Sequence, residues 1–327
     1  MTVVSSDAQV GVVIMAYGTP ATPQDVEPYY THIRRGRPPT PEQLANLQMR
    51  YDALGGTSTL AARTADQVAA ITAALERLQP GRFVTALGQK HAFPFIEDGV
   101  ATLGAQGVTS IIGVVLAPHY SGFSVGEYQS RVASAAGDAG LPTVGIERWH
   151  DLPQYRSFLA AAVTDGLRDL PARTEVVFTA HSLPERVLDG DPYPDELHAS
   201  ADAVADLLGL RHRGIIDGPA SVGDPRWSMA WQSAGATPEP WRGPDILDVI
   251  RERAAGREVA GILVCPQGFV SDHLEVAYDL DIEAQRVADT AGIAFARTRV
   301  LNDDTTVLSA LAARVASLVT IAPAPTA

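Results

Sequence analysis

Short apolar runs that alternate with helical patterns constrain this chain more than any other feature of its sequence. Eight such runs, rich in β-branched residues, are separated by stretches of helical character. They cover residues 11–18, 82–89, 110–118, 142–149, 175–182, 226–233, 260–267 and 294–301. Strands that are apolar along their whole length are typical of parallel sheets covered by helices on both faces. The sequence therefore predicts an α/β fold.

The first four runs resemble the last four. "MAYGTP" (15–20) is echoed by "TAHSLP" (179–184), and "APHYSGFSVGEY" (117–128) is echoed by "CPQGFVSDHLEV" (265–276). In each case a strand ends and a polar residue follows it. The repeat indicates two similar Rossmann-like domains, each a four-stranded parallel sheet flanked by helices.

The repeat also gives domain boundaries and a place for ligands. We expect an N-terminal domain over residues 9–150, a C-terminal domain over residues 151–320 that ends in a helix, and a disordered tail over residues 321–327. The repeat places Tyr17 opposite His181, and Glu127 opposite Glu275. Because open α/β sheets bind ligands beyond the carboxyl ends of their strands, we expect an active-site cleft between the two domains.

A long excursion, residues 24–66, separates the first two runs. It reads as two helical pieces joined by a Pro-rich turn, and it ends near "GGTS" (55–58). Insertions of this length are usually functional. Its arginines suit carboxylates or phosphates, which a guanidinium binds with two parallel hydrogen bonds. They are Arg34, Arg35, Arg37 and Arg50, and they are accompanied by Tyr29, Tyr30 and Tyr51.

Composition excludes several classes of protein. The 327 residues carry a formal net charge of −13, which argues against nucleic acid as a partner. The single cysteine, Cys265, rules out a disulfide framework within the chain and a cluster held by four of its cysteines. No segment reads as a signal peptide or as a membrane span. We expect a cytoplasmic enzyme that is a monomer and makes no stable membrane association.

Three carboxylates, Glu275, Asp279 and Glu283, recur every four residues after the seventh run. Residues four apart share one face of an α-helix, where like charges repel. The helix dipole favours an acid at Glu275 and less so at Asp279, and it does not explain Glu283. A hydrated cation or a proton passed along the row would explain all three. His181, directly after the fifth run, suits either metal binding or proton abstraction, although a structural histidine is the simpler alternative.

The remaining candidates are weaker. Tyr17 and Lys90 follow the first two strands and could be simple boundary residues, whereas His273 lies two residues before Glu275. Cys265 lies inside a run and reads as a small buried residue. The "GGTS" turn lacks the Lys and the preceding strand of a phosphate loop. No G-x-G-x-x-G opens a helix after the first strand, so a dinucleotide site is disfavoured.

Several longer blocks resemble one known family. The blocks are "GVVIMAYGTP", "YYTHIRRGRPP", "RYDALGGTSTL", "GQKH", "TAHSLPERV", "DPYPDELH", "WQSAGATPEPW" and "GFVSDHLEVAYDLDIE". Together they resemble the ferrochelatases, and most of all the coproporphyrin III enzymes of Gram-positive bacteria. The resemblance runs from about residue 11 to beyond residue 283. It implies a monomer of two Rossmann-like domains that inserts Fe²⁺ into a porphyrin in haem biosynthesis.

The resemblance also implies roles for individual residues. His181 and Glu275 would face the porphyrin nitrogens as the catalytic pair, and Asp279 and Glu283 would extend Glu275 into a metal-binding or proton-carrying row. Tyr17 would lie on the opposite side and could ligate the iron of the product. The residues that would line the macrocycle and hold its carboxylates are Arg34, Arg50, Tyr51, Ser58 and Tyr128. Lys90 would lie near the cleft without a definite role. Some actinobacterial relatives carry a [2Fe–2S] cluster, which one cysteine cannot hold, so no cofactor is expected.

The choice of substrate follows from polarity. Coproporphyrin III carries four propionates, whereas protoporphyrin IX carries two. The Arg-rich excursion and the absence of an apolar lip over residues 30–45 favour coproporphyrin III, with protoporphyrin IX as the alternative. Two further alternatives are a cobalt or sirohydrochlorin chelatase and a non-catalytic tetrapyrrole carrier. The "HIRRGR" and "AHSLPE" blocks speak against the first, and the acidic row would have no purpose in the second.

Overall fold

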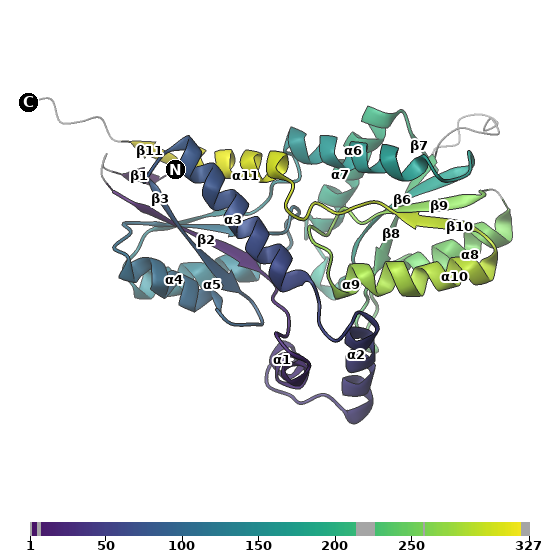
Figure 1. Ribbon diagram of the computed structural model, residues 1–327, viewed down its shortest axis with the longest axis horizontal. Helices are drawn as coiled ribbons and strands as arrows, with labels where there is room; N and C mark the ends of the chain where they lie inside the picture. The colour runs from purple at the N-terminus through teal and green to yellow at the C-terminus, as the bar shows by residue number, and fades with distance from the viewer. Residues whose placement is uncertain (1, 5–7, 214–225, 258, 322–327) are drawn as a thin grey trace, which may run out of the picture. The chain divides into compact units, whose positions relative to one another are not determined.

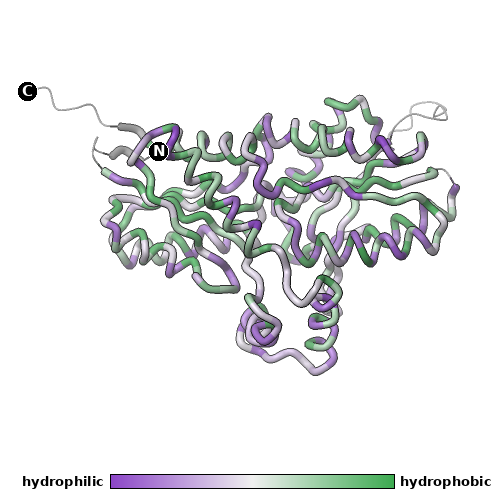
Figure 2. The backbone as a smooth tube through the Cα atoms, viewed as in Figure 1, coloured by the Kyte–Doolittle hydropathy of each residue, from purple (hydrophilic) through white to green (hydrophobic). Residues whose placement is uncertain are grey.

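A computed structural model describes residues 2–4, 8–213, 226–257 and 259–321 of the chain. The chain forms two compact units, Met1–Leu152 with Asn302–Ala327 and Pro153–Leu301. Each unit contains a parallel sheet with helices against both faces (Figure 1). The strands are largely hydrophobic, whereas the helices alternate hydrophobic and hydrophilic positions (Figure 2). The predicted α/β fold with two Rossmann-like halves is confirmed.

The first unit is built on four parallel strands in the order β3-β2-β4-β5. The central strand is buried at every position, because it pairs on both sides and is covered on both faces. Val12, for example, pairs with Thr85 on one side and with Ile112 on the other. The strands are β2 (Val10–Ala16), β3 (Phe83–Gln89), β4 (Ile111–Val115) and β5 (Thr143–Ile146).

Four helices cover this sheet. On one face, α4 (Ile96–Ala105) and α5 (Val125–Asp138) form a core cluster with the strands, whereas α3 (Leu60–Leu78) and α11 (Thr305–Ser317) lie on the other face (Figure 1). Each helix buries one apolar face, as Val100 and Leu103 do on α4. The loops at the carboxyl ends of the strands are thereby held on a rigid support.

The last helix belongs to the first unit. Its N-cap is Asp304, whose carboxylate accepts hydrogen bonds from the amides of Thr306 and Val307. The Gln67 side chain of α3 donates to the Asn302 carbonyl at 2.9 Å, and β11 (Val319–Ile321) pairs with β1 (Thr2–Val4). The prediction that this helix closes the C-terminal domain, residues 151–320, is therefore wrong. Its apolar face packs on α3, a partner that chain order does not reveal.

The predicted tail, residues 321–327, differs at its first position. Ile321 ends strand β11, so the backbone there is ordered by pairing. Residues 322–327 lie outside the described residues.

The excursion after β2 forms two helices, as the sequence predicts. The 3₁₀ turn η1 (Pro23–Asp25) leads into α1 (Val26–Ile33), and α2 (Pro41–Ala53) follows. Thr40 and Gln43 form a capping box at the start of α2. Arg35 and Gly36 have φ values of 55° and 82°, so the chain reverses there through the left-handed region. Both helices stand apart from the sheet layers of their unit (Figure 1).

The second unit contains five parallel strands in the order β10-β9-β6-β8-β7. They are β6 (Thr174–His181), β7 (Arg211–His212), β8 (Arg226–Gln232), β9 (Gly261–Cys265) and β10 (Ala294–Arg297). The predicted four-stranded sheet is therefore wrong by one strand. β7 has two polar residues, and it is a strand only through its pairing with β8, so no apolar run marks it.

Helices cover both faces of the second sheet (Figure 1). α8 (Ile246–Gly256), α9 (Leu274–Ala277) and α10 (Gln285–Ala291) pack on one face, where Val249, Val276 and Ala288 join the core cluster. α6 (Pro153–Leu167) and α7 (Tyr193–Leu208) pack together on the other face, and a 3₁₀ turn, η2 (Glu185–Val187), follows β6.

The two sheets share one strand order. If the four predicted strands of each half are numbered from one to four, the strand order of both sheets is 2-1-3-4. In the second sheet, β7 adds a fifth strand next to strand two, which is β8. This is the flavodoxin-like order, in which the direction of winding reverses between strands one and three. Ligands bind at this switch point, beyond the carboxyl ends of the strands. In the first unit it lies between β2 and β4, and in the second it lies between β6 and β9.

Across residues 2–4, 8–213, 226–257 and 259–321, no helix is both long enough and apolar enough to cross a bilayer.

Candidate active site

His181 and Glu275 meet at the switch point of the second sheet. His181 is the last residue of β6, and Glu275 lies on α9, which follows the neighbouring strand β9. His181 Nε2 lies 3.5 Å from Glu275 Oε1, and the two side chains are 32% and 35% exposed. Strands that are adjacent and parallel deliver their carboxyl ends to one edge of the sheet, which is why residues far apart in sequence form a pair.

Backbone contacts hold both members of the pair. The His181 ring Nδ1 hydrogen-bonds the Ser182 carbonyl, which leaves Nε2 to face Glu275. The Tyr193 hydroxyl donates to the His181 carbonyl at 3.3 Å, and the Gln232 side chain donates to the Glu275 carbonyl at 2.7 Å. The imidazole and the carboxylate are therefore positioned before any substrate arrives.

A second imidazole reaches Glu275. His273 Nε2 lies 3.6 Å from Glu275 Oε2, so each carboxylate oxygen faces one histidine. His273 Nδ1 is buried and has no hydrogen-bond partner among the residues that the structure describes. Only the spacing of two residues between His273 and Glu275 pointed weakly to this contact.

The ionisation of the pair follows from its geometry. Burial alone would lower the pKa of His181, but the Glu275 carboxylate outweighs it and, with the Ser182 carbonyl and Asp279, raises that pKa to about 9. Burial would raise the pKa of Glu275, but His181 and His273 hold it well below its ordinary value. At neutral pH the pair is therefore an imidazolium and a carboxylate.

We expect the His181 imidazole to titrate at pH about 9 in the substrate-free protein. Histidine proton shifts followed by NMR between pH 5 and about 10 would measure this. In Glu275→Gln the opposing charge is gone while burial persists, so the pKa should fall toward or below 6.5. His198, half-buried on α7 with a pKa lowered mainly by burial, is the internal control. A His181 titration unchanged by Glu275→Gln would contradict the coupling.

The same shifts give a pH window for stability. The raised pKa of His181 contributes stability that is complete below pH 6.5 and is lost as the pH rises through about 9. The lowered pKa of Glu275 contributes stability that is present above pH 4.5 and is lost as the pH falls below it. The pair contributes most between these limits.

The acidic row does not lie on one regular α-helix. Residues Asp279–Ala284 form a π-helical segment, η3, in which the Glu283 amide donates to the Tyr278 carbonyl at 2.9 Å. Such segments interrupt α-helices and are frequent at functional sites. The sequence could not indicate this π-helical segment, because the one extra residue in its turn does not change the composition.

The members of the row differ in environment. Asp279 is 6% exposed, and its Oδ2 accepts a hydrogen bond from Ser233 Oγ at 2.5 Å. Glu283 is half-buried. Its charge reaches Asp245, whose pKa is raised mainly by the burial of Asp245 itself and further by Asp248 and Glu283. Negative charge therefore continues from Glu275 through Asp279 to Glu283 and Asp245. Among the described residues, no three His, Cys, Asp or Glu side chains converge into a ready metal site.

Tyr17 lies at the corresponding end of the first sheet. It follows β2 directly, is 42% exposed, and its ring contacts that of His91 at a centroid distance of 4.7 Å. Lys90, which follows β3, is buried; its Nζ lies 2.8 Å from Glu127 Oε2 and 5.2 Å from the centre of the Tyr128 ring. The structure thus gives Lys90 a partner, Glu127, that the repeat had aligned with Glu275.

The other candidates of the first unit lie on the excursion and its exit. The Arg34 guanidinium stacks over the Tyr30 ring at 5.6 Å, and Arg50 is half-buried on α2. Ser58 Oγ accepts a hydrogen bond from the Leu60 amide at 3.1 Å. Tyr51 and Tyr128 are only 3% and 4% exposed, so their rings offer little surface to a ligand.

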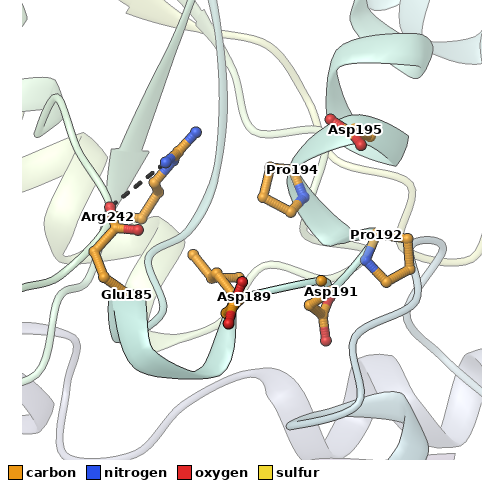
Figure 3. A pocket seen from close by; sticks show the side chains of 9 residues that line it. Glu185, Asp189, Asp191, Pro192, Pro194, Asp195 and Arg242 are labelled. Carbon is orange, nitrogen blue, oxygen red and sulfur yellow. Dashed lines mark ion pairs between the residues drawn. The ribbon is translucent and has the colours of Figure 1, made fainter.

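An acidic pocket of about 590 Å³ lies on the second unit, after β6. Glu185, Asp189, Asp191 and Asp195 line it, and Arg242 forms an ion pair with Glu185 at 3.6 Å (Figure 3). Neither His181 nor Glu275 lines it. No sequence pattern indicated this pocket, although Glu185 ends the "AHSLPE" block and Asp191 and Asp195 lie in the "DPYPDELH" block.

Comparison with known proteins decides the family. A model of the Ferrochelatase family matches residues 9–318. The chain belongs to the ferrochelatase family. It is 40% identical over 299 residues to the Coproporphyrin III ferrochelatase of Halalkalibacterium halodurans, covering 90% of this chain and 92% of that one. It is 38% identical to the protein of the same name from Bacillus subtilis, covering 94% and 97%. It is 41% identical to a Ferrochelatase of Herpetosiphon aurantiacus, covering 91% and 95%.

Solved structures agree on the fold of this ferrochelatase-family chain. SirB from Bacillus subtilis with Fe³⁺ matches with a TM-score of 0.53 at 12% identity, over 94% of this chain and 95% of that one. The sirohydrochlorin chelatase SirB from Bacillus subtilis subspecies spizizenii in complex with cobalt matches with a TM-score of 0.50 at 13% identity, over 94% of both chains. At this identity the likeness is one of architecture.

Proposed function

We propose that the chain inserts Fe²⁺ into coproporphyrin III, with His181 and Glu275 as the catalytic pair. The observation that carries the proposal is the 3.5 Å pair of His181 and Glu275 at the switch point of a ferrochelatase-family fold. The relatives named Coproporphyrin III ferrochelatase support the choice of substrate. Iron and porphyrin are then substrates, the protein needs no cofactor, and it works as a cytoplasmic monomer.

Metallation of the porphyrin exchanges two protons for one Fe²⁺ ion. Two pyrrole N–H protons leave the porphyrin, while Fe²⁺ exchanges its water ligands for four nitrogens. At neutral pH His181 already holds a proton, because Glu275 stabilises its charged form. It becomes a base only when that stabilisation weakens. A cation that approaches Glu275 does this, since two positive charges then compete for one carboxylate. Cation arrival and proton release from His181 are thus coupled.

The acidic row is proposed to serve this exchange. Asp279 holds its carboxylate through Ser233, and Glu283 lies further along the same segment. Carboxylates in series attract Fe²⁺ or pass protons outward. His273 on the far oxygen of Glu275 keeps that carboxylate oriented when His181 changes protonation state.

Residues of the first unit are proposed to hold the macrocycle. Arg34, Arg50 and Ser58 would bind its carboxylates, and the exposed phenol of Tyr17 would face its metal centre. Tyr51 and Tyr128 would act from beneath the surface: Tyr51 lies 3.5 Å from Thr19 Oγ1, and Tyr128 supports Lys90. Clamping the carboxylates gives binding energy that can bend the ring and expose its nitrogen lone pairs.

We expect kcat/KM for coproporphyrin III to exceed that for protoporphyrin IX by about tenfold, since two more carboxylates each gain an exposed ionic contact. Anaerobic turnover with Fe²⁺ and each porphyrin, in matched detergent and followed by absorbance, measures the ratio. Arg34→Met should reduce the ratio, because it keeps length and removes charge. Equal rates for both porphyrins, or a preference for protoporphyrin IX, would overturn the substrate assignment.

A further inference from the structure

We propose that His32 is a positioning residue, which holds the His91 ring in one orientation and one tautomer beside Tyr17. The inference rests on the proposed function, in which Tyr17 faces the metal centre of the porphyrin. It assigns a role in the reaction to a side chain of the excursion, outside the His181–Glu275 pair. All the groups involved belong to the first unit.

The geometry joins four rings in a chain. His32 Nδ1, on α1, lies 3.0 Å from His91 Nδ1, which follows β3. The His91 ring in turn contacts Tyr17, with centroids 4.7 Å apart and planes inclined by 56°. On its other side, His32 stacks on Phe95 with centroids 5.2 Å apart. The Nδ1–Nδ1 hydrogen bond is therefore a polar link between α1 and the ring that supports Tyr17.

The charges around His91 exclude a second proton on it. Burial, the Lys90 ammonium, His32 and the Arg131 guanidinium lower the pKa of His91 to about 3. The acids nearby are already engaged, because Glu127 pairs with Lys90 and Glu97 pairs with Arg131. A neutral imidazole has one N–H, so one nitrogen of the Nδ1–Nδ1 contact donates and the other accepts. The hydrogen bond with His32 thus couples the tautomers of the two rings, and with them whether His91 Nε2 is a donor or an acceptor.

The same positive surroundings argue against a metal ion between the two histidines. A dication there would face Lys90 and Arg131 without a carboxylate of its own. The local charge therefore supports a hydrogen bond, with one proton shared between His32 Nδ1 and His91 Nδ1. Its consequence is a fixed Tyr17 phenol, since the ring packed against it can neither flip nor exchange tautomers freely.

Two substitutions of His32 separate its hydrogen bond from its packing. His32→Asn places an amide where Nδ1 lies and keeps the hydrogen bond, while it loses most of the stacking area. His32→Phe keeps the ring on Phe95 and removes the hydrogen bond. Because one such bond contributes about 0.5–1.5 kcal/mol, His32→Phe should lower kcat by about three- to tenfold with little change in KM. His32→Asn should stay close to wild type.

Imidazole ¹⁵N shifts of His91, assigned with His91→Gln, give a readout that does not need turnover. Wild type and His32→Asn should show one pure tautomer, and His32→Phe should show averaged shifts. In a His91→Phe background, His32→Phe should cause no further loss. If His32→Asn lowered kcat while His32→Phe did not, kcat would depend on ring packing, and the proposal would be overturned. It would also be overturned if the His91 tautomer were the same with and without the His32 hydrogen bond. Wild-type protein that metallates no porphyrin would instead refute the proposed function, and the ¹⁵N shifts would still decide the role of His32.

Discussion

His181→Ala should lower the rate of Fe²⁺ insertion by about 10²- to 10⁴-fold, the range in which a positioned acid–base group contributes. Porphyrin binding should remain nearly intact, because the residues proposed to hold the carboxylates lie on the first unit. The loss should appear in kcat. Without the imidazole, the Oε1 side of Glu275 loses the group that releases a proton when the cation arrives and accepts one from the pyrrole.

The fold should tolerate this substitution. His181 is about one-third exposed, and Glu275 keeps His273 at 3.6 Å, so no buried carboxylate is left alone. Single-turnover metallation measures the chemical step, and fluorescence quenching of the porphyrin measures binding. His198→Ala, which removes a half-buried imidazole on α7 of the same unit, is the matched control and should retain activity. Parallel loss of binding and turnover in His181→Ala would refute the catalytic role.

Eight strands of this fold were predictable from their apolar runs. All eight predicted runs contain a strand, and the repeat between the halves correctly indicated a shared topology. Strands buried on both faces must be apolar throughout, so their burial is recognisable in the sequence. β7 and the docking of α11 on α3 leave no such trace. The first is defined by backbone pairing, and the second by which of several apolar surfaces the helix meets.

The site was predictable in its residues and less so in its contacts. Strand ends drew attention to His181, Tyr17 and Lys90 because polar residues there adjoin the ligand-binding edge. The hydrogen bond of Ser233 to Asp279, the π-helical turn and the His32–His91 contact depend on side-chain rotamers and on one extra residue in a helix turn. Period and composition carry no information on these, and only coordinates supply them.

The second large effect concerns stability rather than chemistry. Glu175 is fully buried at the start of β6, where its carboxylate contacts Arg213 Nη1 at 2.8 Å, Arg253 Nε at 3.1 Å and Ser228 Oγ at 2.6 Å. The two guanidinium side chains are only 19% and 11% exposed. A buried carboxylate is tolerable only with such partners, and its removal leaves the two cations facing each other.

Glu175→Ala should therefore lower the free energy of unfolding by about 3–5 kcal/mol, the cost of breaking a buried ion pair. Urea unfolding, followed by circular dichroism and by Trp fluorescence, measures it. Glu175→Gln should cost less, because the amide still accepts from Ser228 and fills the same volume. Asp165→Asn is the control: its partner Arg168 lies 3.0 Å away, but both are exposed, so the change should be within about 1 kcal/mol.

Position in the strand separates this effect from catalysis. Glu175 and His181 are six positions apart along an extended strand, about 20 Å, so the charge network acts at the edge of the sheet opposite the site. Folded Glu175→Ala protein, assayed at a urea concentration well below its midpoint of unfolding, should insert iron at nearly the wild-type rate. His181→Ala should show the reverse, with a smaller loss of stability and little turnover. If Glu175→Ala lost turnover while still folded, the two ends of β6 would be coupled, and the assignment of chemistry to one edge alone would fail.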